Sequence, residues 1–197
     1  HNPNTTLIAK SDTEFSGVQG QDDWFWGYRD AGADGGGLDS YDPDASFIAF
    51  TGGEGMGDWD GVAQQWAGSA WDLNTAAAGP WTVLGDGGDP QNTHPSGPSP
   101  LHWVVRRWVA TELVETSPLA LRWHVRKINT GCGNGVTGGI YINGQRADTV
   151  SILGGDGTGI FHTYYANVDP GDKIDLILSP TGSDGDNSDG CDSSGLY

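Results

Sequence analysis

The chain has 197 residues, a net charge of −17 at pH 7 and a hydrophobic content of only 36%. The length fits one β-sandwich domain, and the acidic charge repels nucleic-acid phosphates and anionic lipids, which excludes DNA, RNA and membrane-surface binding as main roles. No apolar stretch approaches the roughly 20 residues of a membrane span. Nine tryptophans compensate for the low apolar content, because each buried indole removes a large apolar area from water.

The first half of the chain has irregular patterning. Residues 15–29 and 46–50 have the composition of strands. Residues 52–61 and 85–100 are rich in Gly, Pro, Asp and Asn, which predicts long loops. The segment 60–70 has room for one short helix.

The second half begins with two strands. The first covers 101–109 and follows a proline. The second, 119–128, alternates with a period of two: apolar residues occupy the odd positions, and Arg122, His124 and Arg126 occupy even ones. This alternation predicts a strand with one buried face and one solvent face.

Four more strands follow at short intervals: 136–142, 148–153, 159–168 and 173–179. Asn143-Gly144 between the first two is a strong signal for a type I′ hairpin, and residues 169–172 form another tight turn. Strands at this spacing predict an all-β fold, an antiparallel β-sandwich or jelly roll with long loops in its N-terminal half. No linker divides the chain, so we expect a single domain over residues 1–197.

The two cysteines, Cys132 and Cys191, lie in turn-like segments among glycines and polar residues. One disulfide formed in an oxidising compartment is the favoured interpretation, because exposed thiols in such turns would be a liability. Two unrelated free thiols are the alternative.

Several short motifs follow one another along the chain in a characteristic order. The first motif is Gln-Gly…Trp-Phe-Trp-Gly-Tyr-Arg-Asp over 19–30, and the second is His94-Pro95. A central Trp-Val-Val-Arg-Arg-Trp motif covers 103–108. The last two are Gly-Asn-Gly-Val, which runs into the hairpin at 133–144, and Gly-Asp-Lys-Ile-Asp over 171–175. In combination they resemble a jelly-roll module of secreted and cell-surface bacterial proteins, similar to galactose-binding-type domains. The resemblance implies that fold and a location outside the bacterial cell. Glycan binding follows only by fold analogy. Residues 192–197 stop where such a module would run a final strand, so that strand is short, has been cut or is completed by a neighbour.

Aromatic side chains are the first candidates for binding. Trp24, Trp26 and Tyr28 share one face of a strand, and Trp59 and Trp66 lie near polar loops. The faces of sugar rings pack on aromatic rings, and sugar hydroxyls need polar partners, so an exposed indole beside Asp or Asn suits a glycan. The alternative is that most tryptophans form the core, which we expect for more than half of them.

Basic side chains are the second group of candidates. On adjacent strands, Arg106 with Arg122, His124 and Arg126 would form a positive stripe that binds a sulfated or uronic-acid glycan through guanidinium groups. The favoured alternative is that these arginines pair with the surplus aspartates and fasten loops to the sheet.

An acidic segment close to the C-terminus is a candidate metal site. Alternating acids and glycines can surround Ca²⁺ with oxygen ligands. The candidate ligands are Asp184, Asp186, Asp189 and Asp192. The segment 30–39 is a second possible site for structural Ca²⁺, and a solvated acidic turn is the alternative to both.

No catalytic residues are predicted, because no Ser or Cys lies in a recognisable nucleophile setting. The sequence favours a non-catalytic, extracellular, carbohydrate-binding module whose partner is a polysaccharide. The alternative is a structural or adhesive surface protein, such as a subunit of a filament or matrix that binds copies of itself by strand sharing. A polysaccharide-degrading enzyme is a third hypothesis.

Overall fold

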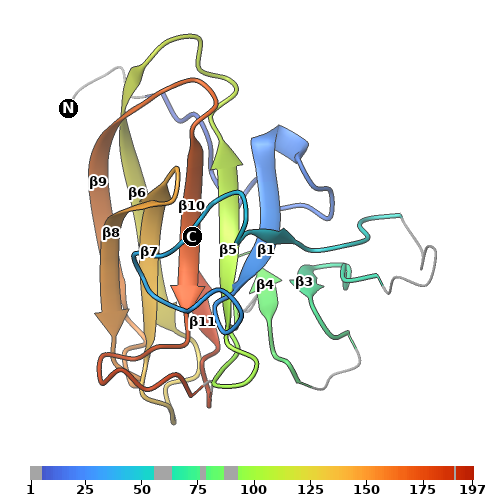
Figure 1. Ribbon diagram of the computed structural model, residues 1–197, viewed down its shortest axis with the longest axis vertical. Helices are drawn as coiled ribbons and strands as arrows, with labels where there is room; N and C mark the ends of the chain where they lie inside the picture. The colour runs from blue at the N-terminus through green and yellow to red at the C-terminus, as the bar shows by residue number, and fades with distance from the viewer. Residues whose placement is uncertain (1–5, 56–63, 76–78, 87–92, 189) are drawn as a thin grey trace.

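A computed structural model of the chain describes residues 6–55, 64–75, 79–86, 93–188 and 190–197. The fold is all-β and antiparallel, as the sequence predicts (Figure 1). Within these ranges the regular structure consists of strands and one 3₁₀ turn, Gln21–Asp23. They contain no helix of the length and apolarity that a membrane crossing requires.

Two sheets form the body of the molecule, and a short ribbon lies beside them. The large sheet has the order β2-β1-β5-β10-β7-β8 and the small sheet the order β11-β6-β9. The large-sheet strands are β1 (Trp24–Asp30), β2 (Ile48–Ala49), β5 (His102–Val109), β7 (Val136–Ile142), β8 (Gln145–Ile152) and β10 (Lys173–Ser179). The small-sheet strands are β6 (Ser117–Lys127), β9 (Ile160–Val168) and β11 (Ser194–Leu196), and the ribbon pairs β3 (Ala70–Asp72) with β4 (Val83–Gly85).

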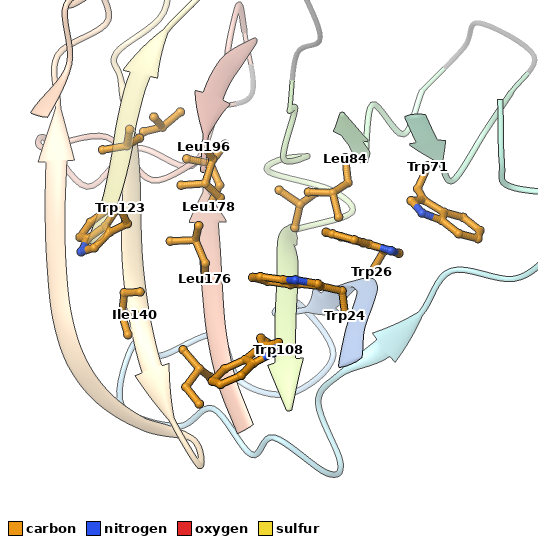
Figure 2. Close-up of a cluster of buried hydrophobic side chains, with 14 of the residues drawn as sticks. Trp24, Trp26, Trp71, Leu84, Trp108, Trp123, Ile140, Leu176, Leu178 and Leu196 are labelled. Atoms are coloured by element: carbon orange, nitrogen blue, oxygen red, sulfur yellow. The ribbon is translucent and has the colours of Figure 1, made fainter. Parts of the chain in front are cut away.

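The main core fills the space between the two sheets and continues under the ribbon. Alternation decides its membership, since the odd positions of β6 and the even positions of β5 and β10 point into it. Figure 2 shows Trp123 of β6 on one side of this core and Trp71 of β3 on the other. Trp24 and Trp26 of β1 stack between these ends, with ring centroids 5.5 Å apart.

The other face of the large sheet is covered by the loop that joins β1 to β2. Trp103 and Tyr141 project from this face and pack against Tyr41 of the loop in a second apolar cluster. Figure 1 shows the loop crossing in front of β10 and β7. The central strands β5, β7 and β10 of the large sheet are therefore buried on both faces.

A buried polar group anchors this loop. Arg107 of β5 lies directly opposite Asp175 of β10, and its Nε and Nη2 donate to the two carboxylate oxygens over 2.7 and 2.8 Å. The Tyr41 hydroxyl donates to the same carboxylate over 2.7 Å, and the Phe47 ring covers the guanidinium. Burial, together with the negative charge of Asp175, raises the pKa of Tyr41. Each polar atom of this group that the loop buries has a partner, as burial of charge requires.

Two connections hold the C-terminal segment. Cys132 and Cys191 form a disulfide, which confirms the pairing predicted from the sequence. Lys127 of β6 is fully buried and donates to Asp192 Oδ1 over 2.8 Å and to the Cys191 carbonyl over 2.7 Å. Strand β11 then pairs with β6 in antiparallel fashion at the edge of the small sheet.

Most predicted elements agree with the structure, and the differences have local causes. Strands β7 and β10 begin and end where predicted, and Asn143 and Gly144 adopt the positive φ values of the expected turn. The strand predicted over 15–29 is wrong before Trp24, because Gly20 and Asp22 have left-handed backbone angles that break an extended chain. The helix predicted over 60–70 lies partly outside the described residues, and 64–70 is not helical.

Candidate functional site

The exposed fraction of each tryptophan shows which indole rings a ligand can reach. Of the eight tryptophans in the described residues, six are less than 9% exposed: Trp24, Trp26, Trp71, Trp103, Trp108 and Trp123. Trp66 is half-buried, and its ring packs 5.2 Å from Trp71. Trp81 is 47% exposed. Among these eight, Trp81 therefore presents the indole most accessible to a ligand.

The aromatic residues singled out from sequence mostly belong to the core. Trp24, Trp26 and Tyr28 do share one face of β1, as predicted, but that face points into the main core. Trp26 is fully buried, so it cannot contact a ligand at the surface. Trp66 contributes to the same packing, and Trp59 lies outside the described residues. The expectation that these side chains bind a glycan is wrong for Trp24 and Trp26, because both are buried in the core. There Trp24 donates to Glu14 and Trp26 packs against Phe15.

Trp81 lines a cleft of about 400 Å³ between two loops. Its walls come from the connection between β3 and β4 and from the segment before β5. Val83 and His94 form an antiparallel bridge, and this register brings Trp81 near Ser96. Two prolines, Pro80 and Pro100, complete the apolar lining. The volume lies within the range of small-ligand pockets.

A chain of buried hydroxyls supports the floor of the cleft. The Thr82 hydroxyl donates to Ser96 Oγ over 3.2 Å and lies 2.8 Å from Nδ1 of His102. Since a hydroxyl has one hydrogen, Thr82 accepts from His102 Nδ1. Ser96 is itself buried, so the accessible hydroxyl of the cleft is that of the exposed Ser99. Burial lowers the pKa of His102, against the smaller opposing effect of Asp30, so the ring is neutral at neutral pH.

A close backbone contact fixes one wall. A Cβ atom at Gly97 would lie 1.9 Å from the carbonyl oxygen of Asn187, so this approach of the two chains admits only glycine. Ser96 and His102 also exchange two backbone hydrogen bonds, of 3.0 and 2.9 Å, which close the loop that carries Ser99. The cleft is therefore held by the body of the fold on this side.

The chemistry of the cleft is that of a neutral, hydroxyl-rich ring. None of the residues that line it is charged, and an indole face is combined with serine hydroxyls and backbone groups. Aromatic faces accept the apolar faces of rings, and hydroxyls pair with hydroxyls. The sequence places Trp81 in a loop-rich region, but it gives no sign that Trp81 rather than Trp66 stays exposed.

The predicted basic stripe does not exist as one surface. Arg106 lies on β5 of the large sheet, and its strand is not adjacent to β6. Its guanidinium is fully buried, lies over the Phe15 and Trp26 rings and donates to the carbonyl oxygens of Ser11 and Gly85. Inclusion of Arg106 in a ligand surface is therefore wrong. Arg106 does fasten loops to the sheet, as the alternative predicts, but it does so through backbone carbonyls and not through the expected aspartates.

The other three members of the stripe do share a surface. Arg122, His124 and Arg126 lie on the outward face of β6, and Phe161 and Tyr165 project from the same face of neighbouring β9. We call this outer surface of the small sheet the β6–β9 face. The aromatic side chains are 72% and 75% exposed. Their positions follow from the alternation of residues 159–168, which the sequence analysis did not use to assign a face.

His124 lies on this face but is buried by neighbouring aromatic rings. Its ring stacks on Phe161 with centroids 3.8 Å apart, and the Tyr197 ring meets it edge-on. Nε2 lies 3.0 Å from the Thr158 carbonyl oxygen, so it carries the hydrogen. Burial lowers the pKa of His124, and Arg126 lowers it further against opposing effects of Thr158 and Asp156. His124 thus holds the Phe161 ring in place by stacking on it, and because His124 is itself buried it offers a ligand little direct contact.

The acidic residues predicted to bind calcium do not act as one group. Asp192 is fully buried and paired with Lys127, which makes its role as a metal ligand with the others wrong. Asp184 accepts from Asn134 and from the backbone of Asp186. Asp189 lies outside the described residues. Among the residues that are described, no three His, Cys, Asp or Glu side chains gather with metal-ligand geometry.

Comparisons with known proteins show limited similarity. No family model matches the chain, and no curated protein matches it significantly. A carbohydrate-binding module of family CBM51, from Clostridium perfringens GH95 and solved with methyl-galactose, is similar at a TM-score of 0.35 and 12% identity. The match covers 54% of this chain and 64% of that one. Similarity at this level carries no argument about the ligand, and the family resemblance of the motifs stays a prediction.

Proposed function

We propose that this protein is a non-catalytic carbohydrate-binding module that holds a neutral sugar residue in the Trp81 cleft. One observation carries the proposal: Trp81 remains 47% exposed and lines a cleft, while six other tryptophans are buried. An exposed indole costs free energy in water, since it leaves a large apolar ring solvated. A sugar ring stacked on it would remove that area from water while the exposed Ser99 hydroxyl offers a hydrogen bond.

A location outside the cell is part of the proposal. The Cys132–Cys191 disulfide supports it, because such bonds persist in oxidising compartments. The lining of the cleft also fits a neutral glycan better than an anion, since none of its residues carries a positive charge that would pair with an anionic group.

Substitution of Trp81→Ala tests the cleft. The wild-type protein is expected to bind at least one neutral oligosaccharide on a glycan array, and the variant is expected to bind it about tenfold more weakly, the scale of one aromatic stacking contact. Trp81→Phe, which keeps a ring, should retain part of the affinity. Isothermal titration calorimetry measures the difference.

The control is Leu153→Ala, which removes an exposed apolar side chain outside the cleft. Its affinity should equal that of the wild type, and near-ultraviolet circular dichroism should show the same fold for all variants. Absence of binding to every neutral glycan, or equal affinity of Trp81→Ala and the wild type, would contradict the proposal.

Calcium binding by Asp184 and Asp186 stays a prediction from the sequence. Both carboxylates lie in the loop after β10 and already accept hydrogen bonds from neighbouring residues. If they bind Ca²⁺, the thermal midpoint should rise with added CaCl₂ and fall with a chelator. An unchanged midpoint would remove calcium from the description of this protein.

A further inference from the structure

The two outer faces of the sandwich differ in their covering. The large sheet hides its outward aromatic residues, such as Trp103, under the β1–β2 loop. The β6–β9 face has no such covering over β9, where Phe161 and Tyr165 are 72% and 75% exposed. Single exposed aromatic residues are common, but two on one strand of an otherwise well-covered sandwich mark a surface that contacts something else.

The charges of this face differ from those of the whole molecule. The outward positions of β6 hold Pro118, Ala120, Arg122, His124 and Arg126, and those of β9 continue the pattern with Phe161, Thr163, Tyr165 and Asn167. None of them is a carboxylate, although the protein has 26 acidic residues. The outward positions of these two strands therefore carry two arginines and no acidic side chain.

Arg122 differs from the other basic side chains. Lys10, Arg29, Arg107, Lys127, Arg146 and Lys173 each pair with an aspartate. Arg106 donates to backbone carbonyls, and Arg126 also has an interaction. Within the part of the chain that the structure describes, Arg122 has no hydrogen bond or ion pair, and its side chain is exposed.

The register places Arg122 midway between the two exposed rings. Arg122 lies opposite Thr163, His124 opposite Phe161 and Ala120 opposite Tyr165. The rings are four positions apart along β9, which corresponds to about 13 Å at the usual rise of a strand. The small side chain of Ala120 leaves the Tyr165 ring accessible from the β6 side.

We propose that the β6–β9 face binds an anionic polysaccharide chain, independently of the Trp81 cleft. Sugar rings would stack on Phe161 and Tyr165, and a carboxylate or sulfate group on the sugar between them would accept hydrogen bonds from Arg122. The planar guanidinium matches either group in a two-point contact. The acidic remainder of the protein opposes binding only weakly, because charges beyond about 8 Å are screened at physiological ionic strength.

Matched pairs of polysaccharides test the charge requirement. One pair is homogalacturonan with and without methyl esters on its carboxylates, and the other is a galactan with and without sulfate esters. In calorimetry at physiological ionic strength, one charged member should bind about tenfold more tightly than its neutral partner, the scale of hydrogen bonds to a charged group. Which pair shows the preference tells whether the anion is a carboxylate or a sulfate.

Variants locate the binding surface. Arg122→Gln should abolish the preference for the charged member, and Tyr165→Ala should weaken binding about tenfold, the scale of a stacked ring. Arg146→Gln removes one positive charge from the Asp39 pair on β8 and should bind as the wild type does. Trp81→Ala should leave anion binding unchanged, which separates this site from the cleft.

Three results would overturn the proposal. The first is equal affinity for charged and neutral members of both pairs, and the second is equal behaviour of Arg122→Gln and Arg146→Gln. The third is a concentration-dependent dimer in size-exclusion chromatography that Tyr165→Ala dissociates, since it would assign the face to a second copy of the chain. None of these results bears on neutral-sugar binding by Trp81.

Discussion

Three arginines show how the surroundings of one residue type decide its role. Arg107 is buried beside a carboxylate and holds a loop, whereas Arg106 is buried against aromatic rings and backbone carbonyls. Arg122 is exposed without an acid beside it. The sequence places all three in predicted strands. Their difference arises from what packs over each strand face.

At the same scale, His124 should make stability depend on pH. The unfolded chain binds a proton near the ordinary pKa of 6.5, whereas burial lowers the pKa of folded His124. The unfolded state therefore binds more protons below about pH 6.5, and the free energy of unfolding should fall as the pH drops from 7 towards 5. Urea unfolding at several pH values measures this slope.

His124→Gln should reduce the slope but not remove it, because His102 is also buried with a lowered pKa and acts in the same direction. Arg122→Gln, on the same strand face, should leave the slope as it is in the wild type. A slope that His124→Gln does not change would show that His124 contributes nothing to the pH dependence.

At the scale of elements, alternation predicts which residues share a face but not what covers that face. The apolar residues at odd positions of 119–125 were correctly assigned to the core face by their period alone. The sequence does not distinguish Trp103 from Phe161, since each is an aromatic residue beside a residue of the main core on its own strand. One is buried by the β1–β2 loop and the other is exposed, which depends on a contact between distant segments.

For the candidate sites too, the sequence predicted which residues share a strand face but not which long-range contacts cover or shape it. The strand face with Arg122, His124 and Arg126 follows from the sequence, because a period of two fixes it. The Trp81 cleft does not, because it depends on the long-range bridge between Val83 and His94. The strand predicted over 15–29 failed for a related reason: composition favoured an extended chain, but glycine and aspartate in left-handed conformations ended it.

The β1–β2 loop should lose its anchor in Asp175→Asn. The substitution removes the charge that the buried Arg107 pairs with, and Tyr41 loses its carboxylate acceptor. We expect the free energy of unfolding to fall by about 3 kcal/mol, the usual cost of leaving a buried charge unpaired. Urea denaturation measures the loss, and limited proteolysis should cut the loop faster.

Asp44→Asn is the matched control, since it makes the same chemical change in an exposed pair with Lys173. Exposed ion pairs contribute little, so its stability should stay close to that of the wild type. Equal effects of the two substitutions would mean that the Arg107–Asp175 pair does not hold the loop.

At the scale of the whole molecule, the disulfide joins two segments that are 59 residues apart in sequence. It fastens the turn before β7 to the turn before β11. Lys127 and Asp192 lie at the same end of the small sheet and add a buried ion pair to this connection.

Replacement of both cysteines by serine should destabilise the protein by up to about 4 kcal/mol, because a closed loop of this length restricts the unfolded chain. Thermal or chemical denaturation under oxidising conditions measures the loss. The single variant Ser188→Ala, in the same segment, should have nearly wild-type stability. A double-serine variant as stable as the wild type would show that the ion pair and β11 alone hold this end.

The strand order of the large sheet has a consequence for synthesis of the protein. Strand β10, at residues 173–179, lies at the centre of that sheet, between β5 and β7. Until the ribosome has released it, those two neighbours lack their shared partner, and their apolar edges are exposed to other chains. A nascent chain would thus stay incompletely folded until nearly all of this domain has been translated.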